Sequence, residues 1–176
     1  MKCSKAVTGY FMGLLMVAGG SPVTALPEDR EQPIRITADS ASRFETTGET
    51  HYTGNVELTQ GSLRINADRI VVQQPQNGAG VIIATGNPAR LKQTPTEQRG
   101  PVSASAERIE YRQDLDTVKL VRNARIEQEG AVVTGATIDY EVNAQQVKAR
   151  AAVSAEDSQR VEVIIPPGAL ERSSEP

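Results

Sequence analysis

The amino-acid sequence predicts an all-β protein of roughly a dozen to sixteen short strands with almost no helix. Apolar side chains occupy alternate positions through most of the chain, which is the period of a strand with one buried face. Turn-forming residues separate these stretches at short, even intervals. No window after the N-terminal segment shows the 3.6-residue period of an amphipathic helix.

The alternation is clearest between Gly54 and Val72. Leu63, Ile65 and Ala67 face one way, and the pattern then shifts by one residue at Asp68-Arg69. A shift of one residue turns the side chains to the other face unless the strand bends. The stretch therefore predicts strands that fold back at a corner or bulge and keep the apolar row inside.

A phrase within this stretch recurs along the chain. Gly54-Asn55-Val56-Glu57-Leu58-Thr59-Gln60 returns at Gly86–Gln93 and, with Arg122 replacing the glycine, at Asn123–Gln128. The steps from Asn55 to Asn87 and from Asn87 to Asn123 are 32 and 36 residues. Repeats of this size are typical of proteins that stack one structural unit on the next, so that the copies share a core.

The N-terminus has the features of an export signal. Lys2 and Lys5 precede an apolar run, and small residues lead to Ala25. This order predicts a cleavable signal peptide over 1–25. An uncleaved anchor is the alternative, and the shortness of the apolar run for a membrane span argues against it. Cys3, the only cysteine of the chain, would leave with the signal. An exported chain without disulfides suits a bacterial periplasm.

Composition limits the classes of partner. Without Lys2 and Lys5, the chain has 17 of its 19 basic residues and 22 acidic residues, which gives a net charge of −5. No basic patch stands out in the sequence, and only four aromatic residues follow the signal, so nucleic acid is not an expected partner.

The remaining elements are expected in order along the chain. A polar leader covers 26–32, Pro33 opens a strand over Ile34–Ala38, and two weak strands flank a turn within Ser42–Tyr52. Polar loops are expected at 73–80 and 94–101, and a disordered polar tail at 168–176. The other strands carry these alternating residues: Val81–Ala84, Ala89–Gln93, Val102–Tyr111, Val118 and Leu120, Ala124 and Ile126, Val133, Ile138–Val142, Val147–Ala151 and Val161–Ile165.

Motifs for catalysis are missing from the sequence. His51 is the only histidine, which excludes a site with several histidine ligands, and no nucleophile elbow or phosphate-binding loop occurs. Four carboxylates recur near the shifts in alternation, and a sugar-cleaving pair would need two of them across a cleft; they are Asp39, Asp68, Glu107 and Asp139. Solvated residues at strand corners are the simpler interpretation, so no enzyme, metal or cofactor is expected.

Several stretches together resemble the OstA-like family. They are Gln32–Ile36, Thr53–Val56, the run QGSLRINADRIVV, Thr85–Ala89, Ser105–Tyr111 and Val163–Pro166. Their order covers a domain at 33–167, and the similarity is greatest to small soluble members that carry lipopolysaccharide across the periplasm. The resemblance implies an open antiparallel β-jelly roll that holds lipid A acyl chains inside and stacks head to tail. It also implies two partners, the inner-membrane-anchored component and the periplasmic domain of the outer-membrane translocon. The chain could itself be one of those related components, although the signal peptide and the lack of a barrel argue against this.

From the inward rows we expect a set of residues to line a lipid-binding trough: Ile34, Ile36, Leu63, Ile65, Leu91, Ile109, Tyr111, Val118, Leu120 and Ile138. Strands at the two ends would leave backbone groups unpaired and invite another protomer. The expected partner interface therefore comprises Ile34, Arg35, Ile36, Thr37, Val161, Val163 and Ile165.

Three classes of function remain open at this point. The first is a lipid-carrying transport bridge, and the second is a structural or adhesive β-repeat protein whose alternating rows simply fill a closed core. The third is a polysaccharide-modifying enzyme that uses Asp39, Asp68 or Asp139.

Overall fold

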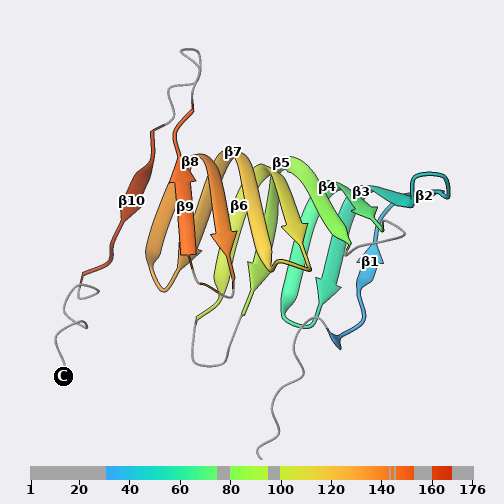
Figure 1. Ribbon diagram of the computed structural model, residues 1–176, viewed down its shortest axis with the longest axis horizontal. Coiled ribbons are helices and arrows are strands. Elements are labelled where there is room, and N and C mark those ends of the chain that lie inside the picture. The colour runs from blue at the N-terminus through green and yellow to red at the C-terminus, as the bar shows by residue number, and fades with distance from the viewer. Residues whose placement is uncertain are drawn as a thin grey trace, which may run out of the picture.

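The computed structural model describes residues 31–74, 80–94, 100–142, 144, 146–152 and 160–167. These residues form ten strands and no α-helix, which confirms the all-β class (Figure 1). The strands are β1 (Arg35–Thr37), β2 (Ser40–Phe44), β3 (Glu49–Gln60), β4 (Leu63–Gln73), β5 (Val81–Gln93), β6 (Val102–Arg112), β7 (Thr117–Gln128), β8 (Ala131–Glu141), β9 (Gln146–Arg150) and β10 (Glu162–Ile164). The expected signal peptide, most of the leader and the tail at 168–176 lie outside the described residues.

All ten strands belong to one antiparallel sheet. Its order is β1-β3-β4-β5-β6-β7-β8-β10, while β2 also pairs with β3 and β9 also pairs with β8. Consecutive long strands are therefore neighbours joined by hairpins. The strands β1 and β2 lie at one end of the stack, and β9 and β10 lie at the other (Figure 1).

Each long strand bends near its middle. In Figure 1 the strands run up, curve over and descend as a row of arches. The sequence shift at Asp68-Arg69 coincides with a break in register between Asn66 and Arg69 of β4, which confirms the predicted bulge. Corresponding breaks occur in the other pairings, between Thr53 and Val56, Thr85 and Ala89, Ser105 and Arg108, and Val121 and Ala124.

The bends divide the sheet into two walls with the core between them. Wall A holds the segments 35–37, 56–60, 63–67, 89–93, 102–106, 124–128, 131–135 and 162–164. Wall B holds the segments 40–44, 49–53, 69–73, 81–85, 108–112, 117–121, 137–141 and 146–150. The short strands β1 and β2 act as one broken arch, and so do β10 and β9, because each pair contacts both halves of its neighbour.

The bends also explain why there are fewer strands than expected. The short strands predicted at Val81–Ala84 and Ala89–Gln93 are the two halves of the single strand β5. A break in alternation looks the same in sequence whether the strand ends or continues through a bulge. The described residues therefore contain ten strands, most of them long, rather than twelve to sixteen short ones.

The repeated Gly-Asn phrase lies at the corners of the arches. Gly54 and Asn55 have φ values of +82° and +46°, in the left-handed region where glycine and asparagine are favoured. The Asn55 amide donates to the Asp39 carboxylate of the preceding arch at 2.9 Å. A Cβ on Gly54 would collide with that same carboxylate, so the glycine is required both by conformation and by space.

The third copy keeps this corner although it lacks the glycine. Arg122 and Asn123 have φ values of +62° and +51°. The Glu107 carboxylate accepts hydrogen bonds from Arg122 Nε at 2.6 Å and from Asn123 Nδ2 at 2.8 Å. The arginine therefore compensates part of the conformational cost with a charged contact that glycine cannot make.

Candidate functional site

The interior between the two walls is lined almost entirely by aliphatic side chains. Along β4, Leu63 and Ile65 are fully buried while Arg64 between them points to solvent. The same alternation in each long strand brings one row from every arch to the interior. These rows form one continuous apolar cluster that extends along the stack.

Eight of the ten residues expected to line the trough are buried in this cluster. From wall A come Leu63, Ile65 and Leu91, and from wall B come Ile109, Tyr111, Val118, Leu120 and Ile138. Ile36 of β1 is partly buried and packs against the cluster. Ile34 lies before β1 with 40% of its surface exposed, so the structure does not bring it into the interior.

The expected list omits other residues that face the same space. Val56, Leu58, Ile70, Ile82, Ile126 and Tyr140 are also buried in the cluster. Their alternation was visible in the sequence, so the same signal would have found them. Val102 and five alanines, at 84, 89, 104, 106 and 124, complete the buried cluster. The small alanine side chains let the walls approach closely.

The two walls are in contact in this structure. Leu58, Ile65, Ile109 and Leu120 have no exposed surface. A guest hydrocarbon chain would therefore have to enter as the walls separate. We call the ends of the walls that lie opposite the bends their feet. Because the bends join the two walls, separation at the feet would leave the strand pairing within each wall intact.

A hydrogen bond links the feet of the opposite walls. Nε2 of Gln113, just beyond the end of β6 in wall B, donates to Oε1 of Gln60 at the end of β3 in wall A, over 2.9 Å. Gln60 is 4% exposed, and its own Nε2 donates to the Gln32 carbonyl at 3.0 Å. Gln93 and Asp116 are the other buried polar residues among the described ones, and both also lie at the feet. The interior is thus apolar, and polar groups lie along its flank at the feet of the walls.

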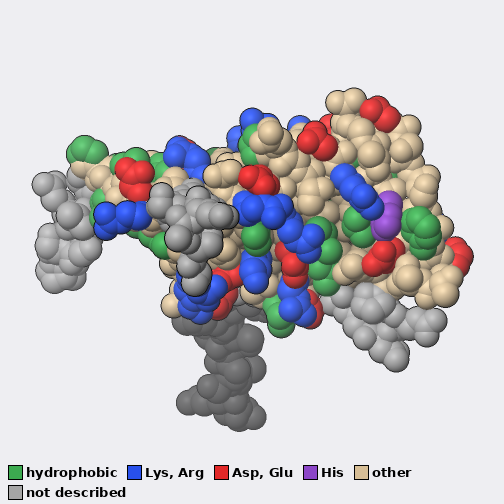
Figure 2. Space-filling view, turned by 90° about the horizontal axis from the view of Figure 1, so that it is seen from above, with side chains coloured by type: hydrophobic (Ala, Val, Ile, Leu, Met, Phe, Trp, Pro, Cys, Tyr) green, Lys and Arg blue, Asp and Glu red, His purple; other side chains and the backbone are tan. Residues whose placement is uncertain are grey.

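The only histidine lies on the outer face of wall B, and Figure 2 shows it, in purple, at the surface. His51 Nε2 contacts Glu49 Oε2 at 3.0 Å, and Arg69 contacts His51 Nδ1 at 3.1 Å. Because arginine only donates, this contact assigns Nδ1 as the acceptor and leaves Nε2 to donate to Glu49. The hydrogen bond from His51, followed by one from Gln73, holds the pKa of Glu49 below its ordinary value of 4.5.

Three of the four carboxylates considered for catalysis have structural partners. Asp39 and Glu107 bind corner asparagines, and Asp139 of β8 forms an ion pair with Arg150 of β9 at 2.7 Å. Asp68 is exposed at the β4 corner. Within the described ranges, no group of three or more His, Cys, Asp or Glu residues is arranged to hold a metal ion. Among the residues that the structure describes, no helix has the length and the apolar character needed to span a membrane.

The residues expected to contact partners lie at the two ends of wall A. Arg35, Ile36 and Thr37 form β1, which pairs with β3 on one side. Val163 lies in β10, which pairs with β8 on one side. Val161, Val163 and Ile165 are exposed, and Val163 reaches 55%. Each end thus has a strand with one unpaired edge among the described residues.

An unclosed stack of β-arches with an aliphatic interior and a polar-rimmed flank defines an OstA-like protein. Residues 35–146 match the family described as LptA/(LptD N-terminal domain) LPS transport protein. The chain belongs to this family, as the resemblance in its sequence predicted.

Individual relatives agree with this assignment. The chain is 34% identical to the lipopolysaccharide export system protein LptH of Pseudomonas aeruginosa, covering 88% of this chain and 91% of the relative. It is 31% identical to LptA of Escherichia coli K12, covering 97% and 90%. The crystal structure of LptH, the periplasmic LptA homologue of the P. aeruginosa lipopolysaccharide transport device, matches with a TM-score of 0.73 and 33% identity over 80% of this chain and 100% of that one. A shorter match, 34% identical over 100 residues, is to the LPS-assembly protein LptD of Photobacterium profundum.

Proposed function

We propose that this chain is a periplasmic lipopolysaccharide transport protein that carries the lipid from the inner to the outer membrane. In this role it holds lipid A acyl chains between wall A and wall B. The observation that carries the proposal is the continuous apolar cluster that runs through successive arches in a protein of the LPS transport family. The role requires no catalytic residue and no cofactor, and the relatives are export proteins.

The physical need for such a carrier follows from the cost of exposing hydrocarbon to water. Each methylene buried is worth about 0.8 kcal/mol, so a chain of about 12 carbons costs about 10 kcal/mol to leave in water. A lipid with several such chains does not cross an aqueous compartment alone. An apolar trough that continues from one protomer to the next would lower this cost along the whole path.

Acyl chains would enter through the flank between the feet of the walls. The lining consists of aliphatic side chains and alanines with few aromatics, so separation of the walls breaks mainly apolar contacts. The Gln60–Gln113 hydrogen bond would open at the same time. The residues proposed to meet the acyl chains are the buried members of the expected set, together with Val56, Leu58, Ile70 and Ile82.

We further propose that protomers stack head to tail. The β1 edge of one protomer would pair with the β10 edge of the next, and because the two edges differ, the contact repeats into an open rod. The same edges would contact the inner-membrane-anchored component and the periplasmic domain of the translocon. The match to LptD supports the second of these partners, because it indicates that the translocon contains a related sequence.

Binding of purified lipopolysaccharide to the full mature chain tests the role. Leu120 has no exposed surface, so a charge there would threaten folding itself. Ile36 is only partly buried and is the better position, and Ile36→Asp should abolish lipid binding in a folded protein. Thr37→Asp, on the same strand but exposed, is the matched control and should bind as the parent does. Lipid binding by folded Ile36→Asp would remove this residue from the proposed lining.

A structural β-repeat protein with a permanently closed core is the second candidate. The full burial of the interior in this structure is the observation that favours it. Uptake of a fluorescent fatty-acyl probe separates the two roles. If the protein does not bind the probe at any protein concentration, the result would support a structural protein with a permanently closed core.

A further inference from the structure

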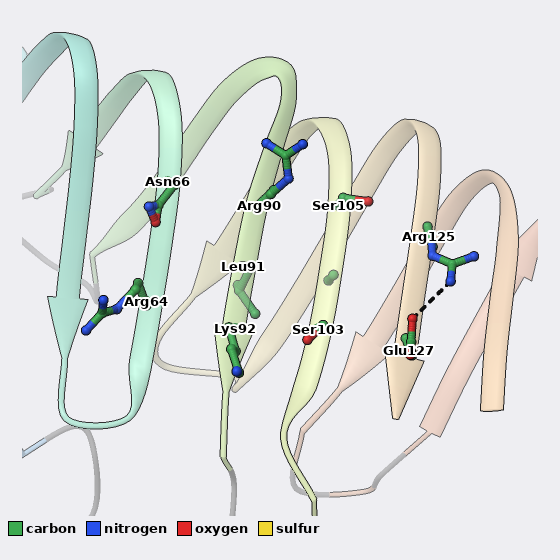
Figure 3. A pocket seen from close by; sticks show the side chains of 10 residues that line it. Arg64, Asn66, Arg90, Leu91, Lys92, Ser103, Ser105, Arg125 and Glu127 are labelled. Atoms are coloured by element: carbon green, nitrogen blue, oxygen red, sulfur yellow. Dashed lines mark hydrogen bonds and ion pairs between the residues drawn. The ribbon is translucent and has the colours of Figure 1, made fainter. Parts of the chain in front are cut away.

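A basic groove crosses the outer face of wall A. It is lined by two neighbouring rows of side chains that the antiparallel register places across β4, β5, β6 and β7 (Figure 3). One row is Arg64, Lys92, Ser103 and Glu127, and the other is Asn66, Arg90, Ser105 and Arg125. The groove has a volume of about 510 Å³, within the range of about 300–1,000 Å³ of small-molecule sites.

The sequence of β6 explains why a hollow forms here. Ser103 and Ser105 present short side chains outward, while the strands on both sides carry long charged ones. Figure 3 shows the two serines between Arg90 and Lys92 of β5 and Arg125 and Glu127 of β7. The floor of the groove therefore offers two hydroxyl groups beside Leu91 and Ala104. Its sides offer four cations and one anion, Glu127.

The charges in the groove are poorly compensated within the protein. Arg64 lies directly opposite Lys92 in the register, and such like-charged cross-strand pairs are unfavourable. Glu57 pairs with Arg64 at 3.3 Å and Glu127 pairs with Arg125 at 2.9 Å. Arg90 and Lys92 form no ion pair with any described residue. The chain as a whole has a net charge of −3, so this local excess of positive charge stands out.

We propose that this groove binds the phosphate groups of the lipid whose acyl chains enter the interior. Arginine side chains bind phosphate oxygens in pairs, lysine adds a point charge, and serine hydroxyls donate to the remaining oxygens. This assignment rests on the proposed function, because it takes the phosphorylated headgroup to belong to the transported lipid.

The position of the groove fits an amphiphile that straddles the rim of wall A. Arg64, Lys92 and Ser103 are each one residue from the foot of the wall, next to Leu63, Gln93 and Val102. One residue of strand spans about 3.3 Å. A lipid with its tails between the feet would therefore have its headgroup within reach of the outer row.

Two lipids with identical acyl chains test the assignment: bis-phosphorylated lipid A and the same lipid A with both phosphates removed. The parent chain should bind the phosphorylated form about 10-fold more tightly, as expected for a few partly screened charge pairs. The double variant Arg90→Gln/Lys92→Gln should bind both forms with the affinity that the parent has for the dephosphorylated one. The preference should also shrink as salt is raised.

A matched variant tests whether the preference for phosphate depends on the groove or only on the net charge of the protein. Arg112 and Lys119 are exposed on the outer face of wall B, and Lys119 lies opposite Glu110 and Asp139. The variant Arg112→Gln/Lys119→Gln removes the same charge and should keep the 10-fold preference. An equal loss of preference in both double variants would overturn the groove.

The outcomes distinguish this inference from the proposed function. If the parent binds neither lipid, the transport role itself fails. If both lipids bind and Arg90→Gln/Lys92→Gln keeps the full preference, the groove is not the headgroup site while the transport role stands. Inorganic pyrophosphate provides a direct probe, and it should shift the amide resonances of Ser103 and Ser105 in the parent chain alone. If the protein binds pyrophosphate but binds the two lipids with equal affinity, the groove is a site for free anions. That result would overturn the headgroup assignment.

Discussion

Gln113 at the foot of wall B donates a hydrogen bond to Gln60 at the foot of wall A, 2.9 Å away. The two residues are 53 positions apart and belong to different arches. Their contact joins the walls at the flank, opposite the bends, where an acyl chain would enter. This single pair therefore reports whether the interior is closed.

A tether between these two positions should prevent lipid uptake. Gln60→Cys/Gln113→Cys, joined by a short bis-maleimide, would hold the feet together and keep the walls in contact. The tethered protein should lose binding of a fluorescent fatty-acyl probe, while the untethered double variant binds it. Uptake by the fully tethered protein would show that lipid enters by another route.

The corner glycine of the first repeat should be essential for stability. Gly54→Ala places a side chain in a left-handed conformation and against the Asp39 carboxylate, at an expected cost of about 1–3 kcal/mol. Urea denaturation measures this free energy of unfolding. Gly80→Ala is the control, because a Cβ there would meet its nearest neighbour at 3.4 Å, an ordinary contact. Equal stabilities for the two variants would contradict the proposed role of the corner.

Glu49 should make stability depend on pH. Its pKa is lowered by hydrogen bonds from His51 and Gln73, so its charged form favours the folded state. The contribution is fully present above its ordinary pKa of 4.5 and is lost as the pH falls through the lower folded-state value. Glu49→Gln should therefore lower the urea midpoint at neutral pH, and the difference from the parent should disappear in acid. Glu45→Gln, at an exposed residue of the β2–β3 turn, should change little, and a pH-independent effect of Glu49→Gln would refute the linkage.

Charges on the β10 edge should weaken assembly. Val163→Asp/Ile165→Asp places two carboxylates on an exposed apolar strand, and repulsion should shift the average mass toward the monomer in a light-scattering concentration series. Leu115→Asp changes an equally exposed apolar residue in the β6–β7 turn and should leave the mass distribution unaltered. A parent mass that stays monomeric at every concentration would exclude end-to-end assembly under those conditions.

The interior could be predicted from the sequence because it depends on local alternation. Because Arg64 lies between Leu63 and Ile65, the alternation shows that these two apolar side chains share the inward face of the strand. The shift in alternation after Ala67 indicates the bend. The Gly-Asn repeat was visible as well, but its meaning required φ values, since the same phrase suits a hairpin turn as well as a corner.

Features that depend on distant residues could not be predicted in this way. The sequence shows no basic patch, yet the register brings Arg64, Arg90 and Arg125 onto one face. The Gln60–Gln113 contact is equally invisible, because a glutamine at a strand end usually meets water. Ile34 shows the opposite limit: it continues the alternation of β1, but the strand begins at Arg35 and leaves it exposed.

The most direct test of the acyl-chain site uses a fatty-acyl probe with a spin label on its chain and a protein labelled at the isoleucine methyl groups. If the chain enters between the walls, the methyl signals of Ile65, Ile109 and Ile138 should broaden strongly, because these residues are buried in the interior. Ile164 and Ile165, which are exposed at the β10 end, serve as surface references and should broaden far less. Broadening confined to Ile164 and Ile165, with the interior methyl signals unchanged, would contradict the account.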